Sequence, residues 1–352
     1  MNIKDKFLKE ILNKLIQHNA TPILVGGCVR DYFLGFDVKD YDIEIYGLNT
    51  LEELESLLEE FGSVNLVGKS FGIVKLTTSL MEYDFSFPRL ENKIAEGHTG
   101  FDVVIDGALD FKEASKRRDF TVNAIGYDYK NKVVLDPFDG LKDINKKELR
   151  HIDDDTFIED PLRVYRAIQF CARFHFLLDN KTFELCRKIV DTNEFINLSK
   201  ERIYEEYKKL FLKSDKPSLG LELLNKLNIE YISKNVISDI DEVSQYNLCS
   251  RDRLIIVFTL LDDILIKISD DKKLLKKIKN LQAFQVPKIF EHKLKQNDTF
   301  ISTLIKKLKM LDNMPKPLYM GKDLIKMGYK PSEKFKSILD TLYKMQLNGE
   351  IC

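Results

Sequence analysis

Two aspartates separated by a single residue, Asp40 and Asp42, are the strongest chemical signal in the sequence. The surrounding stretch, residues 38–46, alternates apolar and acidic residues, which predicts a β-strand. Side chains two positions apart in a strand point to the same face, so the two carboxylates are expected to lie close together. Such carboxylates repel each other unless a cation lies between them, and an all-oxygen ligand set favours Mg²⁺. The alternative is a solvated strand face with no chemistry.

A glycine pair lies just upstream of these carboxylates. An apolar run at residues 23–25 leads into Gly26 and Gly27 and then into a predicted helix over residues 28–35. Glycines let the backbone approach a phosphate closely, and the N–H groups that open a helix can face an anion. A phosphate-binding turn followed by paired carboxylates indicates nucleotide chemistry.

A third carboxylate is expected from residues 81–89, which also predict a strand. Glu82 and Asp84 share one face of that strand by the same period of two. Polymerase-type metal chemistry often takes a third carboxylate from a neighbouring strand. We treat Asp84 as the catalytic candidate, with Glu82 as the alternative, and both could instead be solvent-facing strand residues.

Adjacent arginines, Arg117 and Arg118, precede Asp119 in the next informative stretch. A guanidinium offers a planar fork of donors that suits the oxygens of a polyphosphate. Two such groups side by side are an unusual choice for a plain surface.

A second set of arginines falls in residues 159–174, where Asp160, Arg163 and Arg166 are spaced by three. Pro161 suits the first turn of a helix, and the spacing would place these three side chains along one helix face. The opposite face is apolar and predicts packing against a core. An exposed ladder of ion pairs is the alternative interpretation.

Together these motifs resemble the class II tRNA nucleotidyltransferases (CCA-adding enzymes) and bacterial poly(A) polymerases, which belong to the polymerase-β-like nucleotidyltransferase superfamily. Five motifs, the first of them in two parts, occur in the family's order, and residues 321–351 resemble its tail ending. The motifs are G-G-x-V-R-D at 26–31, K-D-x-D at 39–42, R-R-D-x-T-x-N-A at 117–124, D-P-x-x-G at 136–140, E-D-x-x-R at 159–163 and E-R-I-x-x-E at 201–206.

The resemblance implies roles for individual residues. Asp40 and Asp42 would hold two Mg²⁺ ions, with Asp84 as a further catalytic carboxylate. Arg118 and Arg166 would contact the triphosphate, Asp119 would position it, and Asn123 would lie on the sugar or base side. Asp160 and Arg163 would hydrogen-bond the edge of the incoming cytosine or adenine. The full nucleotide-binding set is Gly26, Gly27, Arg30, Arg118, Asp119, Asn123, Asp160, Arg163 and Arg166.

Four other positions are not assigned to the reaction. Asp136 is expected to form a structural turn and Glu206 to hold its helix, so neither is given a chemical role. Gln169 departs from the family, because many relatives carry a further arginine there. A polar loop is predicted over residues 88–101, and its His98 is not expected to act as a base.

The implied reaction is addition or repair of the 3′-terminal CCA of tRNA from CTP and ATP without a nucleic-acid template. The implied partner is tRNA, held at its acceptor stem and elbow through phosphates, with no DNA and no membrane. A poly(A) polymerase and an enzyme that adds only CC or only A share these motifs. An inactive RNA-binding module is the alternative from another class.

The fold that must position these residues is predicted to be α+β. A polymerase-β-like head would contain a mixed sheet of about five strands with helices on one face, and an all-α neck, body and tail would follow. Helices are predicted at residues 3–19 and 51–62, and strands at 22–25, 41–45, 64–67, 72–78 and 81–89. The predicted domains are a head at 1–140, a neck at 141–200, a body at 201–265 and a tail at 266–352.

Composition supports a soluble, cytoplasmic protein. The chain has 352 residues, 44% hydrophobic and 32% charged, with no apolar run of membrane-spanning length. The five cysteines are scattered and lack metal-site spacing, which favours a reducing compartment. Residues 266–352 contain 19 lysines and no arginine against 9 acidic residues, although the net charge of the chain is −1. This basic tail predicts a phosphate-binding surface, with solvated helix faces as the alternative.

Overall fold

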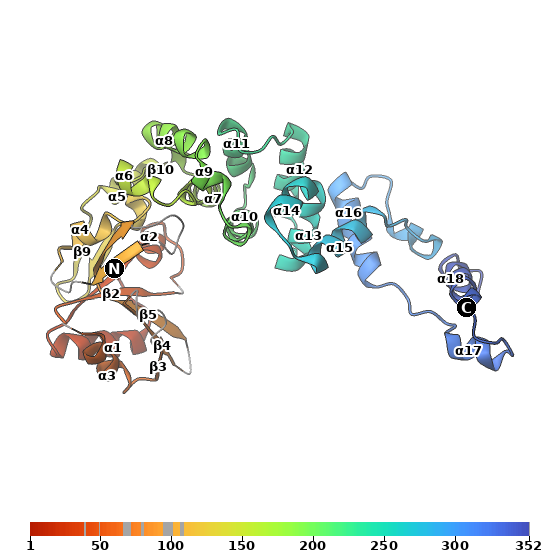
Figure 1. The fold of residues 1–352 in the computed structure, drawn as a ribbon, viewed down its shortest axis with the longest axis horizontal. Helices are drawn as coiled ribbons and strands as arrows, with labels where there is room; N and C mark the ends of the chain where they lie inside the picture. Colours follow the sequence, from red (N-terminus) through yellow and green to blue (C-terminus); the bar gives the residue numbers. More distant parts are fainter. Residues whose placement is uncertain are drawn as a thin grey trace. The chain divides into compact units, whose positions relative to one another are not determined.

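The computed structural model describes residues 1–38, 40–48, 50–65, 72–78, 81–93, 101–105 and 109–351 (Figure 1). They form two compact units. The first comprises Met1–Glu206 with Leu219–Tyr231, and the second comprises Tyr207–Ser218 with Ile232–Cys352. The finer division into head, neck, body and tail stays a prediction.

A seven-stranded mixed sheet organises the first unit, in the order β3-β4-β5-β2-β1-β8-β9. All neighbours are antiparallel except β2 and β5, which run parallel. The α+β class is thus confirmed, but the expected five strands were too few, because the β8–β9 hairpin pairs with β1 and extends the sheet. The strands are β1 (Thr21–Val25), β2 (Asp42–Tyr46), β3 (Ser63–Asn65), β4 (Ile73–Thr77), β5 (Glu82–Ser86), β8 (Gly126–Asp128) and β9 (Val133–Leu135).

Strand β2 begins at Asp42, so the prediction of a strand from residue 38 was wrong at its start. The pairing of β1 with β2 ends at Val25 and Asp42, because β1 stops where the chain turns at Gly26. Asp40 therefore precedes the strand. Burial still alternates through exposed Asp40, buried Tyr41 and exposed Asp42, which is why the sequence pattern indicated a longer strand.

Helices α1 (Lys6–Gln17) and α3 (Leu51–Leu58) pack against each other and against β1 and β4. Each begins at a side-chain cap, with Asp5 accepting from the Leu8 backbone N–H and Thr50 accepting from the Glu53 backbone N–H. Both helices bury a leucine-rich stripe, so they cover the sheet as their periodicity predicts.

The predicted loop over residues 88–101 is partly a strand. Arg89–Lys93 (β6) pairs antiparallel with Phe101–Ile105 (β7) as a separate two-stranded sheet. Residues 89–93 are mostly polar and show no apolar alternation, so this strand was missed. His98 and Lys39 lie outside the described residues.

Helices dominate the remainder of the first unit. Asp136 accepts hydrogen bonds from the backbone N–H groups of Gly140 and Leu141, at 2.7 and 3.0 Å, which supports its structural role at the start of α5. The elements are α2 (Gly27–Phe33), α4 (Phe111–Ser115), the 3-10 helix η2 (Thr121–Asn123), α5 (Gly140–Lys146), β10 (Glu148–Leu149), α6 (Asp154–Ile158), α7 (Arg163–Phe174), β11 (Leu177–Leu178), α8 (Asn180–Val190), α9 (Asn193–Ile196), α10 (Lys200–Lys213), which runs into the second unit, and α11 (Ser218–Lys226).

The regular secondary structure among the described residues of the second unit is all helical, as predicted, with loops between the helices. No helix in the described ranges is long and apolar enough to cross a bilayer. Its helices are α12 (Lys234–Gln245), α13 (Ser250–Leu260), α14 (Asp262–Ile268), α15 (Lys272–Gln282), η3 (Lys288–Lys293), α16 (Phe300–Asp312), α17 (Gly321–Lys326) and α18 (Lys334–Leu347).

Candidate active site

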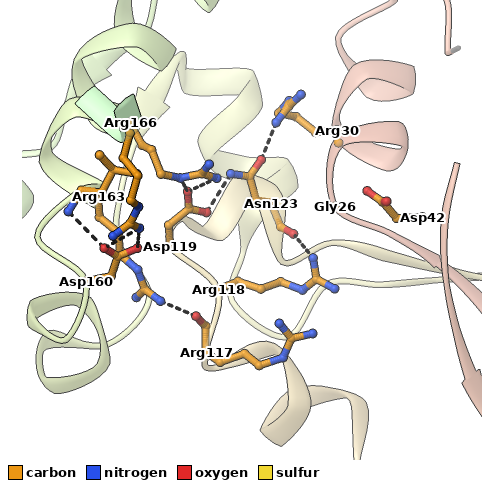
Figure 2. A pocket seen from close by; sticks show the side chains of 13 residues that line it. Gly26, Arg30, Asp42, Arg117, Arg118, Asp119, Asn123, Asp160, Arg163 and Arg166 are labelled. Atoms are coloured by element: carbon orange, nitrogen blue, oxygen red, sulfur yellow. Dashed lines mark hydrogen bonds and ion pairs between the residues drawn. The ribbon is translucent and has the colours of Figure 1, made fainter. Parts of the chain in front are cut away.

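One polar cavity of about 440 Å³ gathers side chains from distant parts of the first unit (Figure 2). It carries six arginines against three aspartates, an excess of positive charge that suits a polyphosphate. Its lining residues are Gly26, Gly27, Arg30, Asp42, Arg117, Arg118, Asp119, Asn123, Asp160, Leu162, Arg163, Arg166 and Arg202.

The carboxylates meet at the start of β2. Asp42 pairs in register with Asp84 on the parallel strand β5. Asp42 is open to the cavity, but the protein around it removes part of its water, and this desolvation raises its pKa. The Arg118 guanidinium opposes the rise, and the charges of Asp84 and Asp40 add to it. The Oδ1 atom of Asp84 is buried and accepts no hydrogen bond, although Lys75 lies 3.7 Å away. Arg118 thus compensates the charge of Asp42 only in part, and the pKa of Asp42 stays above the ordinary value.

Glu82, the alternative third carboxylate, makes exposed contacts with Lys75 at 3.2 Å and Thr77 at 3.5 Å. Asp84 is the direct strand neighbour of Asp42, so it is the better placed of the two. In the described part of the chain, no three carboxylate, imidazole or thiol groups converge closely enough to form a metal site by themselves. A cation here would complete its shell with water and substrate oxygens, as Mg²⁺ usually does.

The turn at Gly26 brings the backbone against two charged side chains. Its φ of +68° is a conformation that favours glycine. A Cβ at this position would lie 3.1 Å from Arg118 Nη1 and 3.7 Å from Asp42 Oδ2. Glycine thus leaves open the space where these opposite charges face each other.

Both adjacent arginines are anchored by a residue that the site prediction omitted, Glu44. Arg117 and Arg118 each donate from Nη2 to the same Oε1 atom of Glu44, at 2.8 Å. Tyr46 donates to the other oxygen at 3.1 Å. Burial alone would raise the pKa of Glu44, but the two guanidinium groups outweigh it and the pKa lies below its ordinary value.

A chain of buried hydrogen bonds links α2 to α7 across η2 (Figure 2). Arg30 donates to Asn123 Oδ1 at 2.6 Å, and Asn123 donates to Asp119 Oδ1 at 2.8 Å. Arg166 donates to Asp119 Oδ2 from Nε and Nη2, at 2.7 and 2.6 Å. Burial alone would raise the pKa of Asp119, but Arg166 and Asn123 have the larger combined effect. The pKa therefore lies below its ordinary value, and the carboxylate is held ionised. Arg30 itself is 5% exposed and lies over the Phe174 ring.

Asp160 and Arg163 lie together in the cavity but not on one helix face, which corrects the prediction. Helix α7 starts at Arg163, two residues after Pro161, because the Leu162 backbone N–H donates to Asp160 Oδ1 at 3.2 Å in the preceding turn. Arg202 Nη2 holds both Asp160 oxygens, at 3.0 and 3.1 Å. Arg163 donates to the carbonyls of Thr156 and Arg117, at 2.9 and 2.5 Å.

All nine predicted nucleotide-binding residues line the cavity, together with Asp42. Asp40 and Asp84 are not among the lining residues, and the roles of all these residues stay predictions. The site prediction missed Glu44, Arg117 and Arg202. Glu44 could have been found, because it lies two positions beyond Asp42 on the same strand face. Nothing in the sequence indicates that Arg202 binds Asp160.

The departure at Gln169 is also visible. Its side chain is 2% exposed in α7, and its Oε1 atom accepts no hydrogen bond. Glutamine is neutral, so this position lacks the charge that an arginine would bring, and Gln169 is not among the residues that line the cavity.

Comparison with known proteins matches two segments of the chain. Residues 23–150 match the family described as poly A polymerase head domain, and residues 175–233 match the probable RNA and SrmB-binding site of polymerase A. A CCA-adding enzyme of Buchnera aphidicola is 38% identical over 208 residues, covering 58% of this chain and 47% of the relative. A multifunctional CCA protein of Aliivibrio salmonicida is 35% identical over 206 residues, covering 58% and 48%. The chain thus spans about half the length of the curated relatives it matches.

Solved structures match almost the whole fold. The Bacillus stearothermophilus CCA-adding enzyme in complex with CTP superposes with a TM-score of 0.74 at 20% identity, covering 99% of this chain and 94% of that one. At this identity the likeness establishes the fold, and it agrees with the α+β head and helical remainder.

Proposed function

We propose that the chain belongs to the family of CCA-adding enzymes and poly(A) polymerases and that it adds or repairs the 3′-terminal CCA of tRNA, using CTP and ATP as substrates. No nucleic-acid template is needed, because protein groups select the base. Each step joins a nucleotide to the 3′-hydroxyl of the tRNA and releases pyrophosphate. We also propose that the protein acts in the cytoplasm.

The observation that carries the proposal is the shared cavity of Asp42 and six arginines, with Asp84 beside Asp42. A nucleoside triphosphate presents its anionic phosphates and its reacting centre within a few ångströms of each other, so an enzyme needs both kinds of group in one place. Arg117 and Arg118 would take the phosphates near the Gly26 turn. A plain RNA-binding surface has no need for carboxylates at that point.

The donor set fits Mg²⁺, which we assign to Asp40 and Asp42 with Asp84 as the third carboxylate. All three offer only oxygen, desolvation makes the charge of Asp42 costly, and Asp84 Oδ1 lacks a hydrogen-bond donor. When bound, two Mg²⁺ ions would activate the 3′-hydroxyl and neutralise the leaving pyrophosphate.

Base selection is assigned to Asp160 and Arg163. Arg202 fixes the Asp160 carboxylate, and two backbone carbonyls fix the Arg163 guanidinium, so both groups are oriented before a nucleotide arrives. An acceptor and a donor fork held in this way can match the edge of cytosine or adenine. Guanine and uracil would leave buried groups unpaired, which is costly.

The test is a one-nucleotide-resolution extension assay with Mg²⁺ and a tRNA transcript that ends at the discriminator base. CTP alone should add two nucleotides, and CTP with ATP should add three and then stop. Asp42→Ala protein serves as the inactive control. Stopping at two nucleotides in both lanes would instead indicate a CC-adding enzyme.

Other outcomes identify the alternatives. Extension only of a transcript that already ends in CC, by one A, would indicate an A-adding enzyme, and a long ladder with ATP alone would indicate a poly(A) polymerase. No extension in any lane would refute the enzymatic proposal and favour an RNA-binding module.

A further inference from the structure

A buried carboxylate lies beneath the cavity and has no assigned role. Glu44 is 1% exposed and sits in the middle of β2, two positions beyond Asp42 on the same face. Its register partners are Ile23 on β1 and Ser86 on β5. Placing an ionised group inside a sheet costs free energy unless it is fully paired. A polypeptide that only needed a stable strand would place an apolar residue there.

The charge of Glu44 is paired with Arg117 and Arg118. Its Oε1 atom accepts from both Arg117 and Arg118 at 2.8 Å, and Tyr46 satisfies Oε2. Two guanidinium groups that share one oxygen are close enough to repel each other strongly in a site of low dielectric constant. One carboxylate charge between them offsets that repulsion, so the two arginines can stay adjacent.

Arg118 still has donors to offer after this pairing. Among the described residues, its buried Nε atom has no hydrogen-bond partner, and its Nη1 atom makes a long contact of 3.5 Å with the Asn123 carbonyl. Nη1 also faces the open space over Gly26, with Asp42 on the other side of that space. A buried donor without a partner beside a cavity indicates a ligand that brings its own oxygens.

We infer that Glu44 is a positioning residue, which holds Arg117 and Arg118 side by side so that they receive the triphosphate and keeps Arg118 from pairing with Asp42. The inference rests on the proposed function for the identity of the nucleotide, but the binding chemistry is that of any linear triphosphate. Without Glu44, Arg118 could pair with Asp42, which it faces across the space over Gly26, and that ion pair would occupy the phosphate position.

The test uses Glu44→Gln in the full-length protein. Binding of inorganic tripolyphosphate and of CTP is measured by calorimetry without tRNA, alongside steady-state nucleotide addition. Glutamine keeps the shape but removes the charge, so both affinities should fall about tenfold to a hundredfold. KM for CTP and ATP should rise by the same factor while kcat changes less than about threefold. Glu113→Gln, which removes an exposed carboxylate paired with Lys116, should leave all these values unchanged.

A double-mutant cycle separates positioning from simple stability. In a background that lacks both arginines, Arg117→Ala with Arg118→Ala, Glu44→Gln should change the remaining tripolyphosphate binding less than about twofold, because its effect acts through these two residues. If Glu44→Gln does not fold, Glu44→Asp carries the same cycle, because it keeps the charge and shortens its reach. Glu44→Asp should restore part of the affinity that Glu44→Gln removes.

Unchanged tripolyphosphate affinity in a folded Glu44 variant would overturn the inference, and so would an equal decrease in both backgrounds. The proposed function fails separately. If the affinity for tripolyphosphate depends on Glu44 but the wild-type protein extends no tRNA, this inference stands and CCA addition is refuted. If the wild-type protein adds CCA normally but its affinity for tripolyphosphate does not depend on Glu44, CCA addition stands and this inference is refuted.

Discussion

The ionised form of Asp42 destabilises the folded protein. Desolvation raises its pKa, and Asp84 and Asp40 add repulsion, so the ionised side chain is destabilising without a cation. We predict that Asp42→Asn abolishes nucleotide addition and leaves the melting temperature in metal-free buffer unchanged or higher. Activity assays and differential scanning calorimetry in EDTA check this. Retained activity, or a lower melting temperature, would contradict it.

Asp119 behaves in the opposite way, because Arg166 and Asn123 hold its pKa below the ordinary value despite burial. A lowered pKa contributes stability above the unfolded-state pKa, and this stability disappears as pH falls through the folded-state pKa. We predict that Asp119→Asn costs about 3 kcal/mol at pH 7, because Arg166 loses its buried partner. Its melting temperature should then fall less between pH 6 and about pH 3 than that of the wild type.

Calorimetry across this pH range, with the exposed Asp191→Asn as control, makes the measurement. Parallel pH curves for the wild type and Asp119→Asn would show that Asp119 does not carry the buried charge.

At the scale of elements, α5 and η2 approach so closely that only glycine fits between them. A Cβ on Gly140 would lie 2.3 Å from the Thr121 carbonyl oxygen and 2.8 Å from Ile125. Gly140→Ala should therefore push α5 away from η2, cost about 1–3 kcal/mol of stability and weaken CTP binding, because η2 ends at Asn123. Denaturant unfolding and CTP titration check both effects.

Gly321→Ala is the matched control, since the glycine also begins a helix but has open space around it. It should be neutral or slightly stabilising. Equal effects of the two substitutions would rule out the steric explanation.

Most elements could be predicted from local sequence, because caps, periodicity and glycine turns act within a few residues. The partners of these elements could not. The extension of the sheet by β8 depends on Ile23 facing Asp128, and the fixing of Asp160 depends on Arg202. The same limit applies to the site. The resemblance named nine nucleotide-binding residues that line the cavity, but it did not name Arg202, and the spacing of Glu44 from Asp42 does not indicate that both arginines share a Glu44 oxygen.

For the whole molecule, the cavity and the lysine-rich helices belong to different compact units. We predict that replacing the exposed residues Lys272, Lys273 and Lys276 of α15 with alanine weakens tRNA binding and lowers its dependence on salt. Every lysine–phosphate interaction that the substitutions remove should reduce the slope of log K against log salt by about 0.9. CTP affinity should not change.

Filter binding at several salt concentrations tests this, with alanine at the exposed Lys4, Lys6 and Lys130 of the first unit as control. An unchanged salt slope in the α15 variant would place the tRNA-binding surface elsewhere.

The parallel pairing of β2 with β5 also sets the time at which this site can form. Parallel strands cannot be joined by a tight turn, and α3, β3 and β4 lie between β2 and β5 in the chain, so Asp42 and Asp84 meet only through a long connection. Pairing over such a distance is entropically costly and slow. Arg202 leaves the ribosome later still. A growing chain therefore carries every aspartate of the site before it has a cavity, and nucleotide binding waits for the whole first unit to fold.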